Sequence, residues 1–393
     1  MKRTMNRTLL LLLILLFFRV MAAAQQERAN GSTGQTTETA LVLAGEATGS
    51  VQDGGSPALS PSGDDSDPGA ADPAKTKKPK PPPKPVDESQ FPTIQDIKVG
   101  YLDSAIIGSG IRFRFDAAFK MIDPDRAEYF YAKCGCYADI PNGAPPLFDA
   151  YAPGPGPGNA TEINFMQAYL SGELAVTPRL SVFAEVPVRS IRYLLYGSFF
   201  VPPGQERFKE LGGLSDTSVG VKLALLASPT HFLTLQMQGV IPTGDASRGM
   251  GTSHGSIVPA ILYYRKLSQY WAIDAEFSDS HPISGSRGIS TVSPGGFAGD
   301  VLFYGVGPSF EMITTENFHL TPVLELVGWT VISGQQTTLT SPASASGTNI
   351  ANIKWGARLS FGKRSSAYVG FGTALTAVTW YKNIFSVEYR YAF

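Results

Sequence analysis

The sequence is poor in the residues that most often carry chemistry. It has two cysteines and four histidines among 393 residues. Two cysteines cannot supply a disulfide scaffold or a four-ligand zinc site. Charged residues make up 17 % of the chain, below the usual figure of about a quarter, and the net charge is −1. No basic excess exists to displace counterions, so a nucleic-acid partner is excluded, and we expect neither a cofactor nor a metal.

Residues 1–24 have the three parts of a secretory signal peptide. These are a basic start, an apolar run over residues 9–18, and alanines ending at Ala24. A membrane-spanning helix needs about 20 apolar residues, and this run has roughly half of that number. We therefore expect cleavage after Ala24 and export of the mature chain.

Residues 25–95 are rich in Gly, Ser, Thr, Asp and Pro and have few aromatic residues. Such a composition cannot bury enough apolar surface to offset the entropy lost on ordering, so it predicts a disordered periplasmic linker. Within it, the lysine- and proline-rich stretch Lys75–Pro85 favours an extended polyproline helix. This stretch is either a solvated spacer or a basic rod that contacts an anionic polymer such as the cell wall.

The remainder, residues 96–393, alternates between apolar and polar residues. At the C-terminal end, Phe385, Val387, Tyr389, Tyr391 and Phe393 share one face, and polar residues fall between them. A period of two indicates a strand with one apolar and one polar face. The pattern recurs along the chain and predicts about twelve strands, each long enough to cross a bilayer at a tilt.

The connections between these strands alternate strictly between short and long. Short turns lie near residues 178, 229, 268, 316 and 363, and the segments between them include residues 120–162, 190–215 and 280–299. Tight turns on one side and long loops on the other are typical of an outer-membrane barrel. We therefore predict an all-β fold, a transmembrane up-and-down antiparallel β-barrel, closed so that no strand edge is left unpaired.

Aromatic residues near strand ends also fit a membrane barrel. We expect an interfacial girdle formed by Trp271, Trp329, Trp355, Trp380 and Tyr381. The C-terminal residues Tyr389, Tyr391 and Phe393 share one face, as in the signal that barrel-insertion machinery recognises. The expected partners are thus outer-membrane lipid and that machinery.

The polar faces of the strands define the predicted lumen. A basic wall is expected from Arg112, Arg114, Lys354, Arg358 and Arg390, and an acidic wall from Asp274, Glu276, Glu311 and Glu325. Charges inside a barrel need partners or water. Either they brace a small plugged lumen, or they line a water-filled pore that orients small solutes. In the pore hypothesis, three arginines oppose two glutamates at a constriction, and these are Arg112, Arg114, Arg358, Glu311 and Glu325.

The first long loop contains Cys134 and Cys136 beside four aromatic residues. In an oxidising compartment this pair predicts a loop disulfide, although the spacing makes a strained ring. The aromatic residues either bind an apolar or aromatic solute, fold into the barrel mouth, or rest against the outer headgroups.

Enzymatic chemistry is not indicated. His231 and His319 lie at short turns, His254 and His281 lie in long loops, and none of them is expected on a strand beside a serine at mid-wall height. Ser253 precedes His254, but neighbouring residues in a loop do not make a catalytic dyad. We therefore expect a protein that is not an enzyme.

Residues 212–222 read GGLSDTSVGVK, residues 240–245 read VIPTGD, and a glycine-rich stretch follows at 251–256. This series resembles the outer-membrane proteins of the MetA-pathway-of-phenol-degradation family, a set of transporters, and the resemblance covers about residues 210–393. It implies a porin-like barrel that passes small solutes. Pro242 and Gly244 also have a purely structural explanation, since they end a strand and start a turn.

These observations predict a passive outer-membrane channel or transporter for small solutes, with hydrophobic or aromatic compounds as candidates. The alternative is a structural anchor or adhesin whose basic linker contacts the cell wall.

Overall fold

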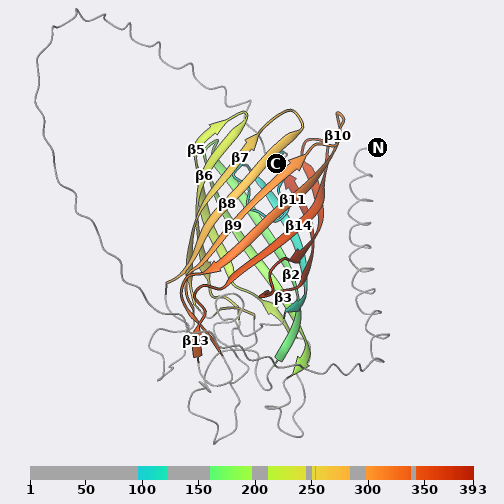
Figure 1. Ribbon diagram of the computed structural model, residues 1–393. Helices are drawn as coiled ribbons and strands as arrows, with labels where there is room; N and C mark the ends of the chain where they lie inside the picture. Colours follow the sequence, from blue (N-terminus) through green and yellow to red (C-terminus); the bar gives the residue numbers. More distant parts are fainter. Residues whose placement is uncertain are drawn as a thin grey trace, which may run out of the picture. The chain divides into compact units, whose positions relative to one another are not determined.

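The computed structural model in Figure 1 describes residues 96–121, 160–196, 211–244, 250–252, 254–283, 298–337 and 342–393. The chain divides into two compact units, Met1–Lys80 and Pro81–Phe393, and all described residues belong to the second. The predicted signal peptide, the linker with Lys75–Pro85, and the pair Cys134 and Cys136 lie outside the described residues. No helix among the described residues is long and apolar enough to cross a membrane.

Within the described residues, twelve long antiparallel strands form one closed barrel. They are β1 (Gly110–Met121), β2 (Ala160–Thr177), β3 (Leu180–Tyr196), β5 (Thr217–Ser228), β6 (His231–Ile241), β7 (Ser256–Lys266), β8 (Trp271–Pro282), β9 (Val301–Phe310), β11 (Phe318–Val331), β14 (Asn349–Phe361), β15 (Ser365–Ala374) and β16 (Asn383–Ala392). Each pairs with the long strand next to it in sequence, and β1 pairs with β16 to close the sheet. The predicted fold class is therefore confirmed.

Four short strands complete the described sheet structure. Strand β4 (Leu211–Leu214) pairs with β3, and β10 (Ile313–Thr314) pairs with β11. Strands β12 (Gln335–Thr337) and β13 (Pro342–Ser344) form a separate hairpin within the connection between β11 and β14. None of the four changes the closure of the barrel.

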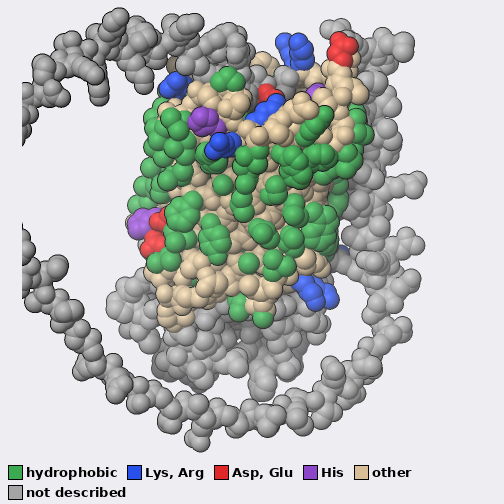
Figure 2. All heavy atoms as spheres, turned by 45° about the horizontal axis from the view of Figure 1, so that its top comes forward, with side chains coloured by type: hydrophobic (Ala, Val, Ile, Leu, Met, Phe, Trp, Pro, Cys, Tyr) green, Lys and Arg blue, Asp and Glu red, His purple; other side chains and the backbone are tan. Residues whose placement is uncertain are grey.

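Every second residue of each strand points outward, and these outward residues are mostly apolar, so the outer face of the barrel is apolar. Leu170 is 60 % exposed and Ile111 is 49 % exposed, and many other large apolar side chains share this face. Figure 2 shows these hydrophobic side chains covering the wall between two more polar rims. Exposing so much apolar area to water would cost roughly 25 cal/mol per Å². The barrel is therefore a transmembrane one, with its apolar belt in lipid.

The two ends of the barrel differ in their connections. At one end the strands are joined by tight turns such as Pro178–Arg179 and Pro229–Thr230, and the C-terminal residue Phe393 lies there too. We call this the short-turn end, which is uppermost in Figure 1. The opposite, long-loop end carries the hairpin of β12 and β13.

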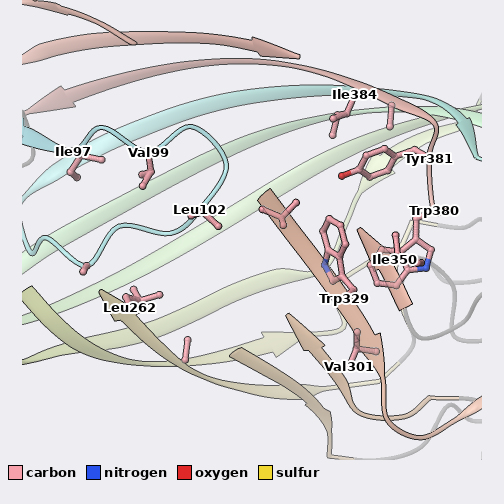
Figure 3. Packing of buried hydrophobic residues seen from close by; sticks show 14 of the residues in the cluster. Ile97, Val99, Leu102, Leu262, Val301, Trp329, Ile350, Trp380, Tyr381 and Ile384 are labelled. Carbon is pink, nitrogen blue, oxygen red and sulfur yellow. The ribbon is translucent and has the colours of Figure 1, made fainter. Parts of the chain in front are cut away.

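The predicted aromatic girdle is wrong for three of its five residues. Trp329, Trp380 and Tyr381 are at most 5 % exposed and pack inside the barrel, whereas Trp271 and Trp355 are 48 % and 44 % exposed on the outside. Figure 3 shows the first three within the buried cluster. Trp329 shares the inward face of β11 with Glu325, so its position in the alternation, rather than its closeness to a strand end, decides where it points.

Residues 96–109, before β1, fold into the barrel, and we call them the lumenal segment. Its apolar side chains Ile97, Val99 and Leu102 are buried in the apolar cluster inside the barrel (Figure 3), and Ile106 is buried there too. At its end, the carbonyl of Ser109 accepts a hydrogen bond from the backbone N–H of Phe393. The interior of the barrel thus contains a piece of chain that is not part of the sheet.

Candidate functional site

The lumen is the candidate site, and Glu325 is its most enclosed acidic group. This side chain, on β11, is fully buried. Its Oε1 accepts hydrogen bonds from the N–H groups of Gly100 at 2.9 Å and Leu102 at 3.3 Å, and its Oε2 accepts one from Tyr101 at 2.8 Å. Consecutive backbone N–H groups form a concave site for an anion. The lumenal segment therefore wraps its backbone around the Glu325 carboxylate.

Arg358, on β14, holds the same part of the segment from the basic wall. It is fully buried, and its Nη2 donates to the carbonyl of Val99 at 2.5 Å and to Glu388 Oε1 at 2.7 Å. Arg390 also donates to Glu388, at 3.0 Å. A buried arginine requires such partners, since an unpaired one would carry a large desolvation cost. Arg358 consequently binds the segment rather than facing an acidic side chain across open space.

Two further acidic residues of the predicted wall also anchor the segment. Glu276 accepts a hydrogen bond from the backbone N–H of Asp103 at 2.8 Å, and Glu311 pairs with Lys98 Nζ at 2.7 Å. The fourth, Asp274, is buried on β8, and its Oδ2 has no hydrogen-bond partner within the described part of the chain. The predicted acidic wall is thus brought together, and three of its members bind the lumenal segment.

Strands β5 and β6 hold the far side of the segment. Lys222 Nζ donates to the carbonyl of Ser104 at 3.2 Å and to Glu173 Oε2 at 3.1 Å. Thr234 Oγ1 donates to the carbonyl of Ala105 at 2.6 Å. Most of these bonds end on backbone atoms, so they depend little on the side chains of the segment.

Glycines in the wall make room for the segment. A Cβ added at Gly305, on the inward face of β9, would collide with the side chain of Leu102, and one at Gly307 would collide with Glu325. Only glycine leaves a notch in the wall at these points. The wall of β9 is therefore shaped to the segment that lies on it.

Two cavities remain beside the segment. One of about 160 Å³ lies toward the short-turn end, where Glu173 and Lys222 line it. The other, of about 410 Å³, opens toward the long-loop end, where Asp216 and His254 line it. The residues that line both cavities mark the neck between them, and they are Asp103, Arg114, Glu185, Ser218 and Gln238.

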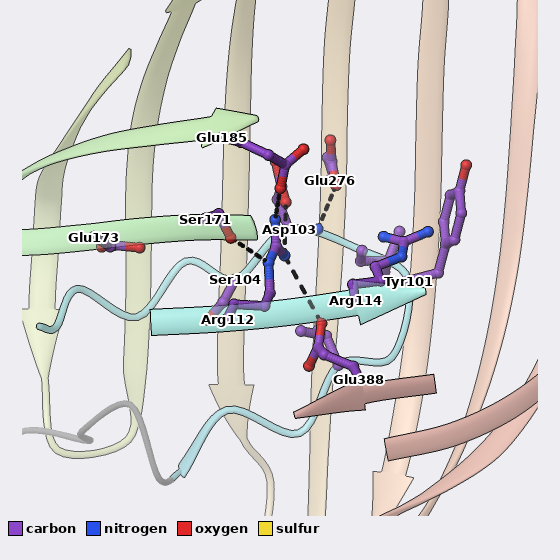
Figure 4. A network of polar contacts seen from close by, with 12 residues as sticks. Tyr101, Asp103, Ser104, Arg112, Arg114, Ser171, Glu173, Glu185, Glu276 and Glu388 are labelled. Atoms are coloured by element: carbon purple, nitrogen blue, oxygen red, sulfur yellow. Dashed lines mark hydrogen bonds and ion pairs between the residues drawn. The ribbon is translucent and has the colours of Figure 1, made fainter. Parts of the chain in front are cut away.

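Opposite charges meet at this neck (Figure 4). Arg112 Nη2 donates to Glu185 Oε2 at 2.7 Å, and its Nη1 lies 3.8 Å from Asp103 Oδ1. Arg114 pairs with Asp116 at 2.5 Å and lies over the ring of Tyr101, 4.7 Å from its centroid. Charge is therefore concentrated at the boundary between the two cavities, where Asp103, Arg114 and Glu185 line both and Arg112 lines the smaller one.

The residues predicted for a constriction fall into two groups. Arg112 and Arg114 lie at the neck, but the acidic groups beside them are Asp103 and Glu185. Arg358, Glu311 and Glu325 contact the lumenal segment. The segment passes between the two predicted walls, and the sequence hypothesis did not include such a segment.

Lys354, another predicted member of the basic wall, is enclosed by aromatic rings. Its Nζ donates to the hydroxyl of Tyr381 at 2.9 Å and lies 2.9 Å from the ring centroid of Tyr101 and 5.8 Å from that of Trp329. A desolvated ammonium over ring faces is attracted by about 2 kcal/mol. Lys354 therefore stabilises the tip of the lumenal segment rather than lining a cavity.

The motif residues around 212–256 meet at the long-loop end. Asp216 accepts hydrogen bonds from the backbone N–H of Gly244 at 3.0 Å and of Thr252 at 2.7 Å. His254 Nδ1 lies 2.9 Å from the carbonyl of Thr252. Burial lowers the pKa of His254, although that hydrogen bond and the charge of Asp216 act in the opposite direction. Asp216 thus ties the start of β5 to the connection after β6, which gives the motif a structural role.

One group of described residues has atoms spaced for a metal ion. Asp279, His281 and Asp300 bring ligand atoms within 4.8 Å of one another, and His281 Nδ1 lies 2.5 Å from Asp300 Oδ1. By the alternation of β8, Asp279 and His281 point away from the lumen. Exposed carboxylates often lie this close without an ion, so we assign the group no role.

Sequence reasoning missed Asp103 and the anchoring role of Lys222. Glu185 and Lys222 fall on the polar faces of β3 and β5, so the alternation could have placed both in the lumen. Asp103 had no such signal, because it belongs to no strand.

No protein-family model matches the chain, and no curated protein matches it significantly. Among solved structures, it resembles the COG4313 outer membrane channel from Pseudomonas putida F1 at 13 % identity and a TM-score of 0.45, covering 76 % of this chain and 100 % of that one. The KdgM porin matches at 9 % identity and a TM-score of 0.32, over 72 % of this chain and 99 % of the porin. The NanC porin matches at 6 % identity and a TM-score of 0.37, over 73 % of this chain and 100 % of that porin.

The resemblance to the phenol-degradation family stays a prediction.

Proposed function

We propose that the protein is an outer-membrane channel that passes small solutes along the lumenal segment. The observation that carries this proposal is the pair of cavities, of about 160 and 410 Å³, which share lining residues at a charged neck. A polar passage with charged side chains at its narrowest point is how pores select solutes.

The charges at the neck suit small polar solutes that carry separated partial or full charges. Arg112 and Arg114 lie on one strand, while Glu185 and Asp103 lie beside them on other segments. A solute crossing between them meets positive and negative groups together and is oriented by them. We propose Arg114, Glu185 and Asp103 as the selectivity residues, in place of the pairing expected from sequence.

The wider cavity adds an aromatic character to the passage. Tyr101, Tyr169, Phe303 and Trp329 line it, and Phe303 and Trp329 have ring centroids 5.4 Å apart. Rings can stack on a solute with a flat apolar face while arginines bind its polar groups. This supports solutes with an aromatic or otherwise apolar part, which are the candidates expected from the sequence.

The orientation follows from the two ends of the barrel. Short turns of outer-membrane barrels lie in the periplasm, and long loops lie outside the cell. Lys98 pairs with Glu311 beside the turn between β9 and β11, so the described chain begins at the short-turn end. On this basis we propose a periplasmic location for residues 25–95.

Conductance of the purified protein in a planar bilayer tests the channel. We expect open steps, a shift toward cation selectivity in Arg114→Ala, and a shift toward anion selectivity in Glu185→Gln. Arg179→Ala, at an exposed turn, removes the same charge as Arg114→Ala and should leave the selectivity unchanged. A barrel that never conducts, or identical selectivity in all four proteins, would contradict the proposal.

A structural anchor is the second candidate, and the filling of the lumen favours it. Glu325 and Arg358 are both fully buried against the lumenal segment, as expected for a barrel built for rigidity. The test is a pull-down of the full chain with isolated cell wall. Binding that disappears when Lys75, Lys77, Lys78, Lys80 and Lys84 become Gln, together with a silent bilayer, would support the anchor instead of the channel.

A further inference from the structure

Both ends of the lumenal segment lie at the same end of the barrel. At its start, Asp96 and Lys98 line a small cavity with Ser268 and Tyr270, in the turn between β7 and β8. At its finish, Ser109 accepts hydrogen bonds from Phe393 and Ala175, near the ends of the chain and of β2. The segment therefore enters through the short-turn opening, turns inside the lumen, and leaves through the same opening. Withdrawing it would not require threading the chain through the barrel.

The wall holds the segment mainly through its backbone. The carbonyls of Val99, Ser104 and Ala105 accept hydrogen bonds, and the N–H groups of residues 100–103 donate them. Water can replace such bonds one at a time, because each exchanges one polar partner for another.

The wall groups that make these bonds are compatible with a water-filled lumen. Glu276, Glu325, Arg358 and Lys222 are charged, and Thr234 is polar. Charged residues in a membrane protein are tolerated where they face a watery cavity.

Specific recognition comes from a few apolar side chains. Leu102 and Ile106 are at most 1 % exposed, and Leu102 fits the notch left by Gly305. Tyr101 lies between Arg114 and Lys354, 4.7 Å and 2.9 Å from its ring centroid. These contacts fix the register of the segment, as pockets for alternate side chains do when a peptide binds an extended site.

We infer that the lumenal segment is a removable gate and that the inner wall of the barrel is its peptide-binding site. The gate opens by withdrawal of residues 96–109 through the short-turn opening, which joins the two cavities into one wide lumen. This inference rests on the proposed channel function. Lys98 and Glu311 pair near the start of the segment, at the short-turn end, and withdrawal must separate them.

A deletion of residues 97–106 combined with peptide rescue tests the gate. We expect the deletion to raise the unitary conductance severalfold over the full chain. A synthetic peptide of residues 96–109, added on the short-turn side, should block the deleted channel, while addition on the other side should not. The control peptide carries Leu102→Asp and should block poorly, because a charge cannot occupy the notch at Gly305.

A second variant tests the gate without removing any residue, so its result does not depend on whether the deletion variant folds. Gly305→Val fills the notch for Leu102 within an otherwise complete chain, and we expect it to raise the fraction of time spent in the high-conductance state. Conversely, a disulfide formed in the double variant Ala105→Cys, Thr234→Cys should abolish the high-conductance state until the disulfide is reduced.

The outcomes separate the gate from the channel. If the full chain conducts while the deletion, the peptide and Gly305→Val change nothing, the gate is overturned and the channel stands. If all forms are silent, the channel itself is overturned. If the peptide blocks the deleted channel only when it is added on the short-turn side, the result supports both the gate and the channel.

Discussion

The two sides of the lumen have the same kinds of residues and use them differently. On the side of β8, β9 and β11, the charges of Glu276, Glu311 and Glu325 are saturated by the lumenal segment. On the side of β1 and β3, Arg112 and Glu185 pair with each other beside open space. Inward-facing charge alone therefore does not distinguish a binding surface from a passage; the partner that each charge finds does.

The sharpest test of this contrast is Glu325→Ala on the filled side. It leaves three backbone N–H groups without their acceptor, at about 1–3 kcal/mol for each one that water does not reach. We expect release of the segment, higher conductance, and a fall in the unfolding free energy of several kcal/mol, on the order of the summed cost. Urea titration followed by electrophoretic mobility, with bilayer recording, measures both.

Glu316→Ala is the matched control, since it removes the same charge from an exposed turn next to the filled side. Glu316→Ala should change neither the conductance nor the unfolding free energy. If Glu325→Ala were as stable and as weakly conducting as Glu316→Ala, the segment would not depend on that carboxylate.

On the open side, Arg112→Ala should change the ion selectivity and leave the unfolding free energy almost unchanged. The pair with Glu185 is partly water-accessible, so its loss should cost only about 1 kcal/mol of stability. The reversal potential in a salt gradient should shift toward cation selectivity, because Glu185 and Asp103 then lose the positive charge that pairs with them. A stability loss equal to that of Glu325→Ala, with unchanged selectivity, would erase the contrast between the two sides.

The smallest effect is expected from pH at the mouth of the filled side. Glu311 lies in the turn after β9. Burial alone would raise the pKa of its carboxyl, but the hydrogen bond and charge of Lys98 hold it below the ordinary value. A carboxyl with a lowered pKa stabilises the folded form above its unfolded pKa of about 4.3 and loses that contribution as the pH falls through the folded value.

The wild type and Lys98→Met should therefore differ in the fraction of closed channels at pH 7 and pH 5, and converge only as the pH falls through the lowered pKa of Glu311. Bilayer recording across this range measures the difference, which we expect to stay under about 1 kcal/mol because Glu311 is only partly buried. A difference that grows on acidification would assign the anchoring of the segment to another group.

Much of the fold could be predicted from local pattern. Phe385, Val387 and Tyr389 alternate with polar residues because each strand has lipid on one side, and in the structure Arg112 and Glu325 lie on the polar, inward faces of their strands. Trp329 also follows the alternation, which turns it inward although it lies near a strand end.

The lumenal segment could not be predicted in this way. Val99, Gly100 and Ser104 are held through backbone atoms, which every residue has, so the sequence of the segment has little trace of its partners. Asp103 likewise gains its place at the neck from the path of the chain rather than from a periodic pattern. What the sequence does record is the notch at Gly305, which has meaning only once its occupant Leu102 is known.

The contact between Val99 and Arg358 also bears on how the barrel is assembled. These residues are 259 positions apart in the chain, and Gly100 is 225 positions from Glu325. Contacts at such separation form late, because the entropy of closing the intervening loop must be lost first. We therefore expect the lumenal segment to reach its final position late, after the strands that carry Glu325 and Arg358 have come together. Its docking would then be a final step of assembly, which seals a sheet that is already formed.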